Sequence, residues 1–236
     1  VVLFPELAVT GFSCEDLFFS AALLDASRRA LVAIVAASTE HGATLVVGAP
    51  WALPDGRLLN CAFVIASGEV IGAVPKAHLP NYGEFYDQRW FASGAGVEET
   101  VRDRILGSFP LAQGLLFEVG AGAGEPVRFA IEICEDLWAP EPPGARHAVA
   151  GAELVLNPSA SNELVAKADY RRDLVRMSSA TRLCAYLYAS AGPSESTKDV
   201  VFGGHLIAAE NGTVLEESER FRLEGATLRV DFDLQR

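Results

Sequence analysis

The sequence predicts an α/β fold with mixed β-sheets, and three observations lead to this prediction. Apolar runs of strand length alternate with segments of helical periodicity in the early part of the chain. Hairpin signals occur near residues 60–74 and 203–218, and hairpins join antiparallel strands, which argues against a purely parallel sheet. The 236 residues are 50% hydrophobic and contain neither an internal repeat nor a low-complexity linker, so we expect one domain with a large core.

The first half of the chain is expected to form a helix and several strands. Runs rich in apolar and β-branched residues predict strands over residues 1–4, 43–50, 60–66, 70–74 and 115–119. Leucine, isoleucine and valine recur at helical spacing over residues 20–41, and Gly42 suits the end of that helix. The pair Ser67-Gly68 predicts a hairpin turn. Residues 81–114 lack clear periodicity, so we expect a long, partly ordered loop region there, which in a compact domain usually means function.

The second half is expected to continue in the same way. Strands are predicted over residues 127–133, 153–157, 185–191 and 226–233. A rigid turn at 140–144 precedes a short helix, and residues 167–182 form a longer helix whose arginine-rich side we expect to be solvated or paired with carboxylates. The pair Asn211-Gly212 predicts another hairpin. The glycine-rich segment 120–126 links two strands and opens no helix, so we interpret it as a hairpin loop rather than a dinucleotide-binding loop.

Composition and charge argue against several classes of protein. The net charge is −12 and the sequence pI is about 4.8, which disfavours nucleic acid and anionic membranes as partners. No apolar run reaches the length of a membrane-spanning helix. The four cysteines and four histidines lack metal-ligand spacing, so we expect no metal site, reduced thiols and a cytoplasmic location. The chain opens inside an apolar run without an initiator methionine, so we also expect a fragment of a longer chain.

Cys134 is the candidate nucleophile. It ends the predicted strand 127–133 and is followed at once by two acidic residues, so the chain must turn there. A thiol at the end of a buried strand is held rigidly and faces a cleft. The alternative is an ordinary core cysteine, because cysteine is often fully buried. The sequence CEDLF at residues 14–18 echoes CEDLW at 134–138, but Cys14 follows a turn rather than a strand, so Cys134 is the preferred candidate.

Three chemically apt residues each end or closely follow an apolar run: Glu6, Lys76 and Cys134. Strand ends can converge at one edge of a sheet although they are far apart in sequence. A carboxylate takes the proton of a thiol whose ordinary pKa is about 8.5, the thiolate attacks a carbonyl carbon, and an ammonium stabilises the oxyanion. We therefore predict an acyl-transfer site, with a purely structural Glu–Lys ion pair as the alternative.

Three segments carry a resemblance to a known family: FPELAVTGFSCEDL, PKAHLPNYGEFYDQRWF and EICEDLW. They resemble the signature segments of the nitrilase, or carbon–nitrogen hydrolase, superfamily. The likeness is greatest to the glutaminase domains of glutamine-dependent NAD⁺ synthetases, which the SESTKD segment at residues 194–199 also fits. The resemblance covers essentially the whole chain. It implies an αββα sandwich of nitrilase type with mixed sheets, lacking its first strand and helix, in protomers that form homo-oligomers.

The resemblance also implies roles for individual residues. Glu6 would be the general base, Cys134 the nucleophile, and Lys76 an oxyanion donor together with the backbone N–H of Glu135. Glu84 would orient the substrate amide. The α-carboxylate and α-amino group of glutamine would be held by Tyr82, Ser161 and Lys167. Alternative interpretations are a surface position for Glu84, simple loop packing for Tyr82, and a helix-capping role for Ser161.

On this basis residues 1–236 are expected to be a glutamine amidohydrolase domain. It would hydrolyse L-glutamine to glutamate and ammonia through a cysteine thioester, without a metal or cofactor of its own. ATP, Mg²⁺ and deamido-NAD⁺ would be used by a C-terminal synthetase domain of the same polypeptide. Two alternatives are a stand-alone nitrilase-type amidase acting on another small amide or carbamoyl compound, and an inactive scaffold domain.

Overall fold

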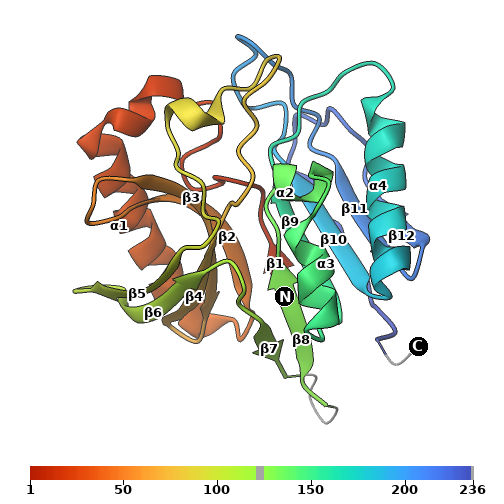
Figure 1. The fold of residues 1–236 in the computed structure, drawn as a ribbon, viewed down its shortest axis with the longest axis horizontal. Helices are drawn as coiled ribbons and strands as arrows, with labels where there is room; N and C mark the ends of the chain where they lie inside the picture. The colour runs from red at the N-terminus through yellow and green to blue at the C-terminus, as the bar shows by residue number, and fades with distance from the viewer. Residues whose placement is uncertain (121–124, 235–236) are drawn as a thin grey trace. The chain divides into compact units, whose positions relative to one another are not determined.

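The computed structural model describes residues 1–120 and 125–234 of the chain. The chain falls into two compact units, Val1–Leu115 and Leu116–Arg236. Each unit contains one six-stranded sheet with both parallel and antiparallel pairs, together with its own helices (Figure 1). The prediction of an α/β fold with mixed sheets is therefore confirmed.

The sheet of the first unit has the strand order β1-β2-β3-β4-β6-β5. Its strands are β1 (Val2–Leu3), β2 (Leu45–Ala52), β3 (Leu58–Ala66), β4 (Glu69–Pro75), β5 (Glu98–Asp103) and β6 (Gly107–Ala112). Strands β2, β3 and β4 form an antiparallel meander, whereas β1 runs parallel to β2 and β4 runs parallel to β6. The hairpin predicted at Ser67-Gly68 joins β3 and β4, and both turn residues have a positive φ.

The expected long loop over residues 81–114 was wrong for much of its length. It contains the short 3₁₀ helix η3 (Asp87–Arg89) and the antiparallel β5–β6 hairpin at the edge of the sheet. The hairpin escaped prediction because β5 is mostly charged and exposed, as is typical of an edge strand. Strand β6 does alternate, with Phe109 and Leu111 buried, but Pro110 between them weakens the strand signal.

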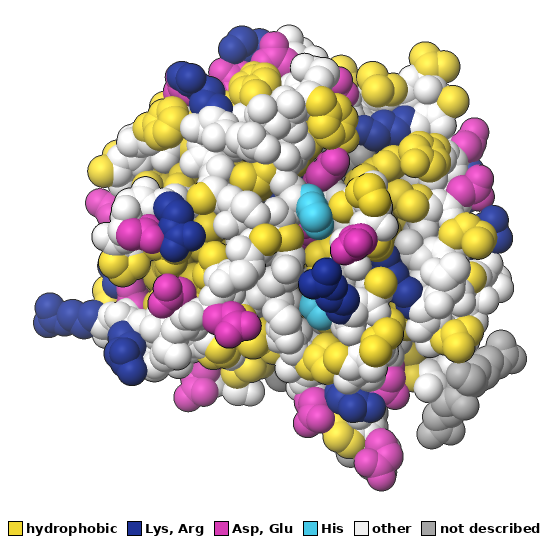
Figure 2. Space-filling model, viewed as in Figure 1, with side chains coloured by type: hydrophobic (Ala, Val, Ile, Leu, Met, Phe, Trp, Pro, Cys, Tyr) yellow, Lys and Arg dark blue, Asp and Glu magenta, His cyan; other side chains and the backbone are white. Residues whose placement is uncertain are grey.

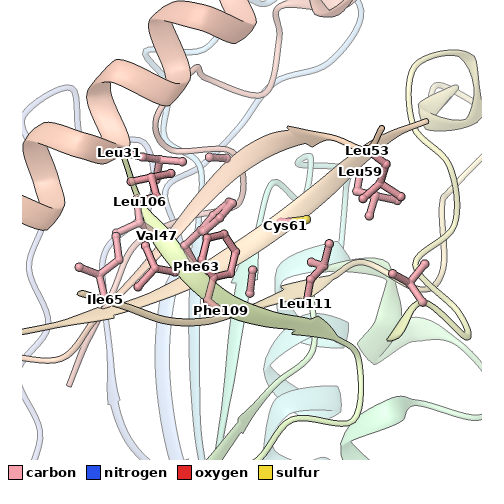
Figure 3. Close-up of a cluster of buried hydrophobic side chains, with 14 residues drawn as sticks. Leu31, Val47, Leu53, Leu59, Cys61, Phe63, Ile65, Leu106, Phe109 and Leu111 are labelled. Carbon is pink, nitrogen blue, oxygen red and sulfur yellow. The ribbon is translucent and has the colours of Figure 1, made fainter. Parts of the chain in front are cut away.

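The core of the first unit lies between the sheet and helix α1 (Ala21–Ala37), which ends in the 3₁₀ turn η2 (Ser38–Glu40). Leu31 from the helix packs in one buried cluster with Val47, Phe63 and Phe109 from three strands (Figure 3). The rings of Phe63 and Phe109 meet edge to face with their centroids 6.1 Å apart, an arrangement that adds to the stabilisation from apolar burial.

The sheet of the second unit has the strand order β12-β11-β10-β9-β8-β7. Its strands are β7 (Phe117–Val119), β8 (Val127–Ile131), β9 (Leu154–Ser159), β10 (Ala185–Ser190), β11 (Leu206–Glu210) and β12 (Thr213–Glu217). The central strands β8, β9 and β10 are parallel, and antiparallel hairpins close both edges. Its helices are α2 (Glu135–Trp138), α3 (Pro143–Val149) and α4 (Lys167–Arg182), and α4 packs on β10, β11 and β12.

Helix α4 occupies the residues predicted for it, and its arginines pair with carboxylates, which was one of the two expectations. The prediction of a strand over 226–233 was wrong, and the structure shows no strand there. Charged and apolar residues alternate in this segment, which is why a strand was predicted. The segment does not pair with β12, which is the last strand of the sheet on that side. Residues 121–124 of the glycine-rich segment lie outside the described residues, and the strands that flank the segment, β7 and β8, pair antiparallel.

No helix within residues 1–120 and 125–234 is long and apolar enough to cross a membrane. No disulfide joins the four cysteines. On the face shown in Figure 2, basic side chains are interspersed with acidic ones rather than gathered in one patch.

Candidate active site

Glu6 lies in a turn that directly follows β1. The backbone N–H of Phe4 bonds to Val46 O at 2.9 Å, and the chain then turns at Pro5. Gly48 on β2 makes room for this turn, because a Cβ atom there would lie 2.2 Å from the backbone nitrogen of Leu7. The close approach of two backbones therefore fixes the start of the Glu6 side chain, which is buried.

Lys76 follows β4 and meets Glu6 inside the first unit. Its Nζ lies 2.7 Å from Glu6 Oε1 and 3.0 Å from Asp87 Oδ2. The amide of Asn60 donates a hydrogen bond to Glu6 Oε1 at 2.7 Å. All four side chains are only about 1% exposed. The structure thus brings together two of the three predicted catalytic residues and adds Asp87 and Asn60 to them.

Asp87 was missed by the sequence analysis. The ammonium of Lys76 lies between the carboxylates of Glu6 and Asp87. Burial raises the pKa of Asp87, the charge of Lys76 lowers it, and the charge of Glu6 raises it. The net result is a raised pKa. The segment PKAHLPNYGEFYDQRWF contains two acidic residues, Glu84 and Asp87, and nothing in the sequence separates the buried one from the other. Asp87 is the first residue of η3, which carries it to Lys76.

Tyr82 and Glu84 lie on the loop between Lys76 and η3. Tyr82 is 60% exposed, and its ring meets that of Phe85 edge to face at 6.2 Å. Glu84 is half-buried. Their roles in substrate binding stay predictions.

Cys134 lies between β8 and the short helix α2, as expected for a thiol where a strand ends and the chain turns. Its φ of 46° and ψ of −101° are unusual for a residue other than glycine. Two bonds hold this elbow: Cys134 N–H donates to Pro158 O at 3.1 Å, and Ile133 N–H donates to the carboxylate of Asp136 at 2.9 Å. A residue with unusual backbone angles on a sharp turn between a strand and a helix is also found at nucleophile elbows, although Cys134 itself is buried. Glu135, the predicted oxyanion donor, is the first residue of α2.

Glu132, two residues before Cys134, anchors the chain directly after β8. Its side chain is fully buried and accepts hydrogen bonds from Arg182 and Tyr186, both at 2.6 Å, and from the N–H of Gly144 at 2.7 Å. These partners come from α4, β10 and the start of α3, so one carboxylate ties three elements together. Burial and the charge of Glu132 raise the pKa of Tyr186 well above its usual value, which keeps the phenol protonated as the donor.

Replacing Glu132 with glutamine is expected to lower the free energy of unfolding by about 3–5 kcal/mol, because it leaves the buried guanidinium of Arg182 without its counter-charge. Urea unfolding followed by circular dichroism measures the change. Glu141→Gln is the matched control, since the Glu141–Arg146 pair is more than 80% exposed on both sides and its loss should change stability by less than about 1 kcal/mol. Equal effects of the two substitutions would contradict the anchoring role.

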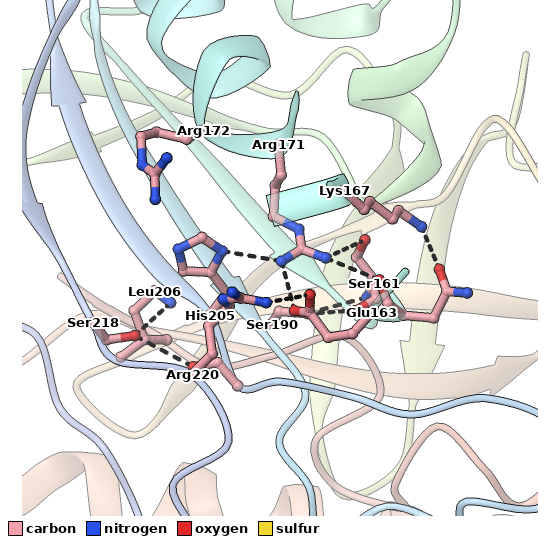
Figure 4. A network of polar contacts seen from close by, with 12 residues as sticks. Ser161, Glu163, Lys167, Arg171, Arg172, Ser190, His205, Leu206, Ser218 and Arg220 are labelled. Carbon is pink, nitrogen blue, oxygen red and sulfur yellow. Dashed lines mark hydrogen bonds and ion pairs between the residues drawn. The ribbon is translucent and has the colours of Figure 1, made fainter. Parts of the chain in front are cut away.

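Ser161 and Lys167 lie close together in the second unit. Ser161 is buried, and its N–H donates to Ser190 Oγ at 3.1 Å. Lys167 begins α4 and donates a hydrogen bond to Asn162 Oδ1 (Figure 4). Its Nζ also lies 5.4 Å from the centre of the Trp138 ring in α2. The alternative in which Ser161 caps α4 was wrong, because the residue at the cap position is Ala166.

The structure groups the predicted residues in two sets. Glu6 and Lys76 are in contact in the first unit, which also carries Tyr82 and Glu84. The second unit contains the remaining predicted residues, which are Cys134, Glu135, Ser161 and Lys167. The meeting of Cys134 with Glu6 and Lys76 stays a prediction.

The carbon–nitrogen hydrolase family profile matches residues 1–236. The chain therefore belongs to this family and is a carbon–nitrogen hydrolase domain. It is similar to the glutamine-dependent NAD(+) synthetase of Mycobacterium tuberculosis, with 43% identity over 223 residues that make up 94% of this chain and 32% of that protein. The protein of the same name from Aquifex aeolicus is 29% identical over 98% of this chain and 36% of its own length. The chain thus spans about a third of the length of these curated relatives.

Solved structures give the same result. The crystal structure of a glutamine-dependent NAD(+) synthetase from Cytophaga hutchinsonii matches 92% of this chain and 34% of its own with a TM-score of 0.80 and 30% identity. An amidase of the nitrilase superfamily from Nesterenkonia matches 92% of this chain and 72% of its own with a TM-score of 0.68. At 21% identity the second likeness concerns the fold alone.

Proposed function

We propose that this chain hydrolyses the side-chain amide of L-glutamine to glutamate and ammonia, with Cys134 as the nucleophile. The observation that carries the proposal is the 43% identity, over 94% of the chain, to proteins named glutamine-dependent NAD(+) synthetase. Two features of the chain support it. A strained elbow presents a thiol after a buried strand, and a buried carboxylate–ammonium pair supplies the two other groups that amide hydrolysis needs.

In the first half of the proposed reaction, Glu6 takes the thiol proton and Cys134 Sγ attacks the amide carbon. The oxygen of the amide becomes an oxyanion, which Lys76 Nζ and the N–H of Glu135 stabilise. Glu6 then gives its proton to the amide nitrogen, and the carbon–nitrogen bond breaks. Ammonia departs, and a γ-glutamyl thioester remains on Cys134.

In the second half, Glu6 takes a proton from water while the water oxygen attacks the thioester carbon. The same donors stabilise the second oxyanion. The carbon–sulfur bond breaks, the Cys134 thiolate recovers a proton from Glu6, and glutamate leaves. Tyr82, Glu84, Ser161 and Lys167 would hold and orient glutamine. The net reaction consumes one water and needs neither a metal nor a cofactor in this domain.

The relatives' names also support a proposal about the whole protein. These names join glutamine to NAD(+) synthesis, so ammonia would pass to a synthetase domain of the same polypeptide. By the family resemblance, that domain would use ATP, Mg²⁺ and deamido-NAD⁺. We place this activity in a cytoplasmic homo-oligomer, which is what the reduced thiols and the family resemblance favour.

A panel of small amides and carbamoyl compounds tests the substrate of the full-length gene product. Glutamate and ammonia should appear in equal amounts from glutamine, and asparagine and simple amides should react far more slowly. Preference for another amide would favour a nitrilase-type amidase of different specificity.

Labelling tests the nucleophile. Mass spectrometry after exposure to a diazoketone analogue of glutamine should find the label on Cys134. If neither labelling nor hydrolysis is seen, the inactive scaffold domain is the alternative that remains.

A further inference from the structure

Arg171 is a buried cation that the proposed reaction does not use. It lies in the second turn of α4 and is the largest fully buried side chain among the described residues. Arginine is almost never fully buried unless it is paired, so its partners show what the position is for. The sequence analysis expected the arginines of this helix to be solvated or paired, and nothing in the sequence separates Arg171 from its neighbours.

Four hydrogen bonds connect the guanidinium to a short segment and a histidine (Figure 4). Its Nη2 donates to Ser161 Oγ at 3.2 Å and to Asn162 O at 3.0 Å, and its Nη1 donates to Glu163 Oε1 at 2.8 Å. The remaining N–H of Nη1 points to His205 Nδ1 at 3.0 Å. One planar group therefore holds three consecutive residues, 161–163, which we call the serine segment.

His205 completes this arrangement as a neutral acceptor. A guanidinium only donates, so Nδ1 of His205 must accept and Nε2 must carry the proton, which it donates to Glu217 at 2.6 Å. Burial lowers the pKa of His205, and the charge of Arg171 lowers it as well. The carboxylate of Glu217 raises it, but the pKa stays below its usual value. The neutral form that the geometry requires is thus also the form that the surroundings favour.

Contacts other than those of Arg171 also support the serine segment, and the first is the bond from Ser161 N–H to Ser190 Oγ at 3.1 Å. The segment follows β9, and beyond that strand its backbone forms an isolated bridge between Asn162 and Phe202 and a bond from Glu163 N–H to Val201 O at 2.7 Å. Arg220 also pairs with Glu163 at 2.9 Å, but from a partly exposed position where such a pair contributes little. The hydrogen bond from Arg171 Nη2 at 3.2 Å acts on the Ser161 hydroxyl itself, whereas the bond to Ser190 holds the Ser161 backbone.

We infer that Arg171 is a positioning residue for glutamine binding: its guanidinium sets the place of the Ser161 hydroxyl and of Asn162, through which Lys167 is held. This inference rests on the proposed function, in which Ser161 and Lys167 bind the amino-acid end of glutamine. The four N–H groups of the two terminal nitrogens of Arg171 already have acceptors within the protein, and the fifth N–H, on Nε, is buried without an acceptor among the described residues. We therefore assign Arg171 an effect on glutamine that acts through Ser161 and Asn162.

The charge of Arg171 also reaches Cys134. Burial by itself would lower the pKa of Arg171, but Tyr188, Glu163 and Cys134 outweigh it and raise the pKa. The charges of the two groups therefore interact, and the reactivity of Cys134 is a useful second readout for substitutions of Arg171. A lysine keeps the positive charge but loses the planar guanidinium with its paired donors. Arg171→Lys therefore separates the effect of the charge from the effect of the hydrogen bonds to the serine segment.

In the full-length protein, Arg171→Lys is expected to raise KM for glutamine roughly tenfold or more, which corresponds to about 1.4 kcal/mol. The value of kcat should stay within about threefold, because the reacting groups are untouched. The pH profile of Cys134 alkylation by iodoacetamide should also be unchanged. Arg176→Lys is the matched control on the same helix, since Arg176 pairs only with nearby Asp173 at 3.5 Å in the described contacts, and its KM should equal that of the parent.

A double variant shows whether Arg171 acts through Ser161. If it does, Ser161→Ala with Arg171→Lys should raise KM no more than the larger single effect, whereas independent effects would multiply. Should Arg171→Lys fail to fold, Glu163→Gln weakens the same anchor without removing the guanidinium, and a rise in KM of several fold is expected. A folded Arg171→Lys or Glu163→Gln with unchanged KM, or a fall in kcat alone, overturns the inference. A parent protein that does not hydrolyse glutamine overturns the proposed function and the inference with it.

Discussion

Replacing Cys134 with alanine is expected to abolish glutamate release, with a loss of at least about a thousandfold, the order seen when a covalent nucleophile is removed. Alanine keeps a side chain of similar apolar character at a position that is only 6% exposed, so the fold should survive. In the full-length protein, synthesis supplied with ammonia instead of glutamine should continue. Coupled assays of glutamate release and of ammonia-dependent synthesis measure the two effects separately.

The other three cysteines provide the controls for this experiment. Cys14 belongs to the echo of the nucleophile motif, and its thiol donates to Thr10 O at 3.2 Å. Burial raises the pKa of Cys184 to about 11 and raises that of Cys61 further, so neither forms a thiolate at neutral pH. Cys14→Ala should therefore leave glutaminase activity intact. Activity that survives Cys134→Ala and disappears with Cys14→Ala would move the nucleophile to the first motif.

Local patterns predicted most of the fold because they are decided by neighbouring residues. The helix over 167–182 and the hairpins at Ser67-Gly68 and Asn211-Gly212 follow from side-chain periodicity and from turn chemistry. The β5–β6 hairpin was missed because an edge strand buries few side chains and so has a weak apolar pattern. The segment 226–233 has a strand-like pattern without a strand to pair with, which no local signal reveals.

The contact between Glu6 and Lys76 was predictable because each residue follows an apolar run, whereas Asp87 and Glu132 were missed because their burial depends on distant partners. Glu6, Lys76 and Cys134 each follow such a run. Glu132 and Arg182 are 50 residues apart in sequence, and no spacing rule connects them. Charged residues are assumed to be exposed unless a partner is known, so a buried network is visible only in three dimensions.

Replacing Lys76 with methionine is expected to have the second largest effect. Methionine has a similar length but no charge, so Glu6 and Asp87 would be left buried beside each other without the ammonium that now contacts both. Removing one partner of a buried charge cluster costs about 3–5 kcal/mol, and removing an oxyanion donor lowers kcat by about a hundredfold to a thousandfold. Urea unfolding and glutamate release are the two measurements.

The pH dependence of this variant identifies the cause. A carboxyl whose pKa is raised on folding binds its proton more tightly in the folded state, so its contribution to stability falls as pH rises through the raised pKa. The pKa of Asp87 is already raised by burial with Lys76 in place, and loss of that cation removes the interaction that lowers it. Lys76→Met should therefore be less destabilised at about pH 5 than at about pH 8, both above the ordinary carboxyl pKa of about 4.

Asp87→Asn provides the control, because it keeps the 2.7 Å contact between Lys76 and Glu6 and replaces a carboxyl that burial already drives toward its neutral form. Added to Lys76→Met, it should recover part of the lost stability by removing one of the two buried carboxylates, while activity stays low. A Lys76→Met protein that is destabilised but fully active would make the Glu6–Lys76 pair structural only. Stability reports on the charge of the ammonium, and glutamate release reports on its proposed role as an oxyanion donor, so the pair of measurements separates a core ion pair from a catalytic one.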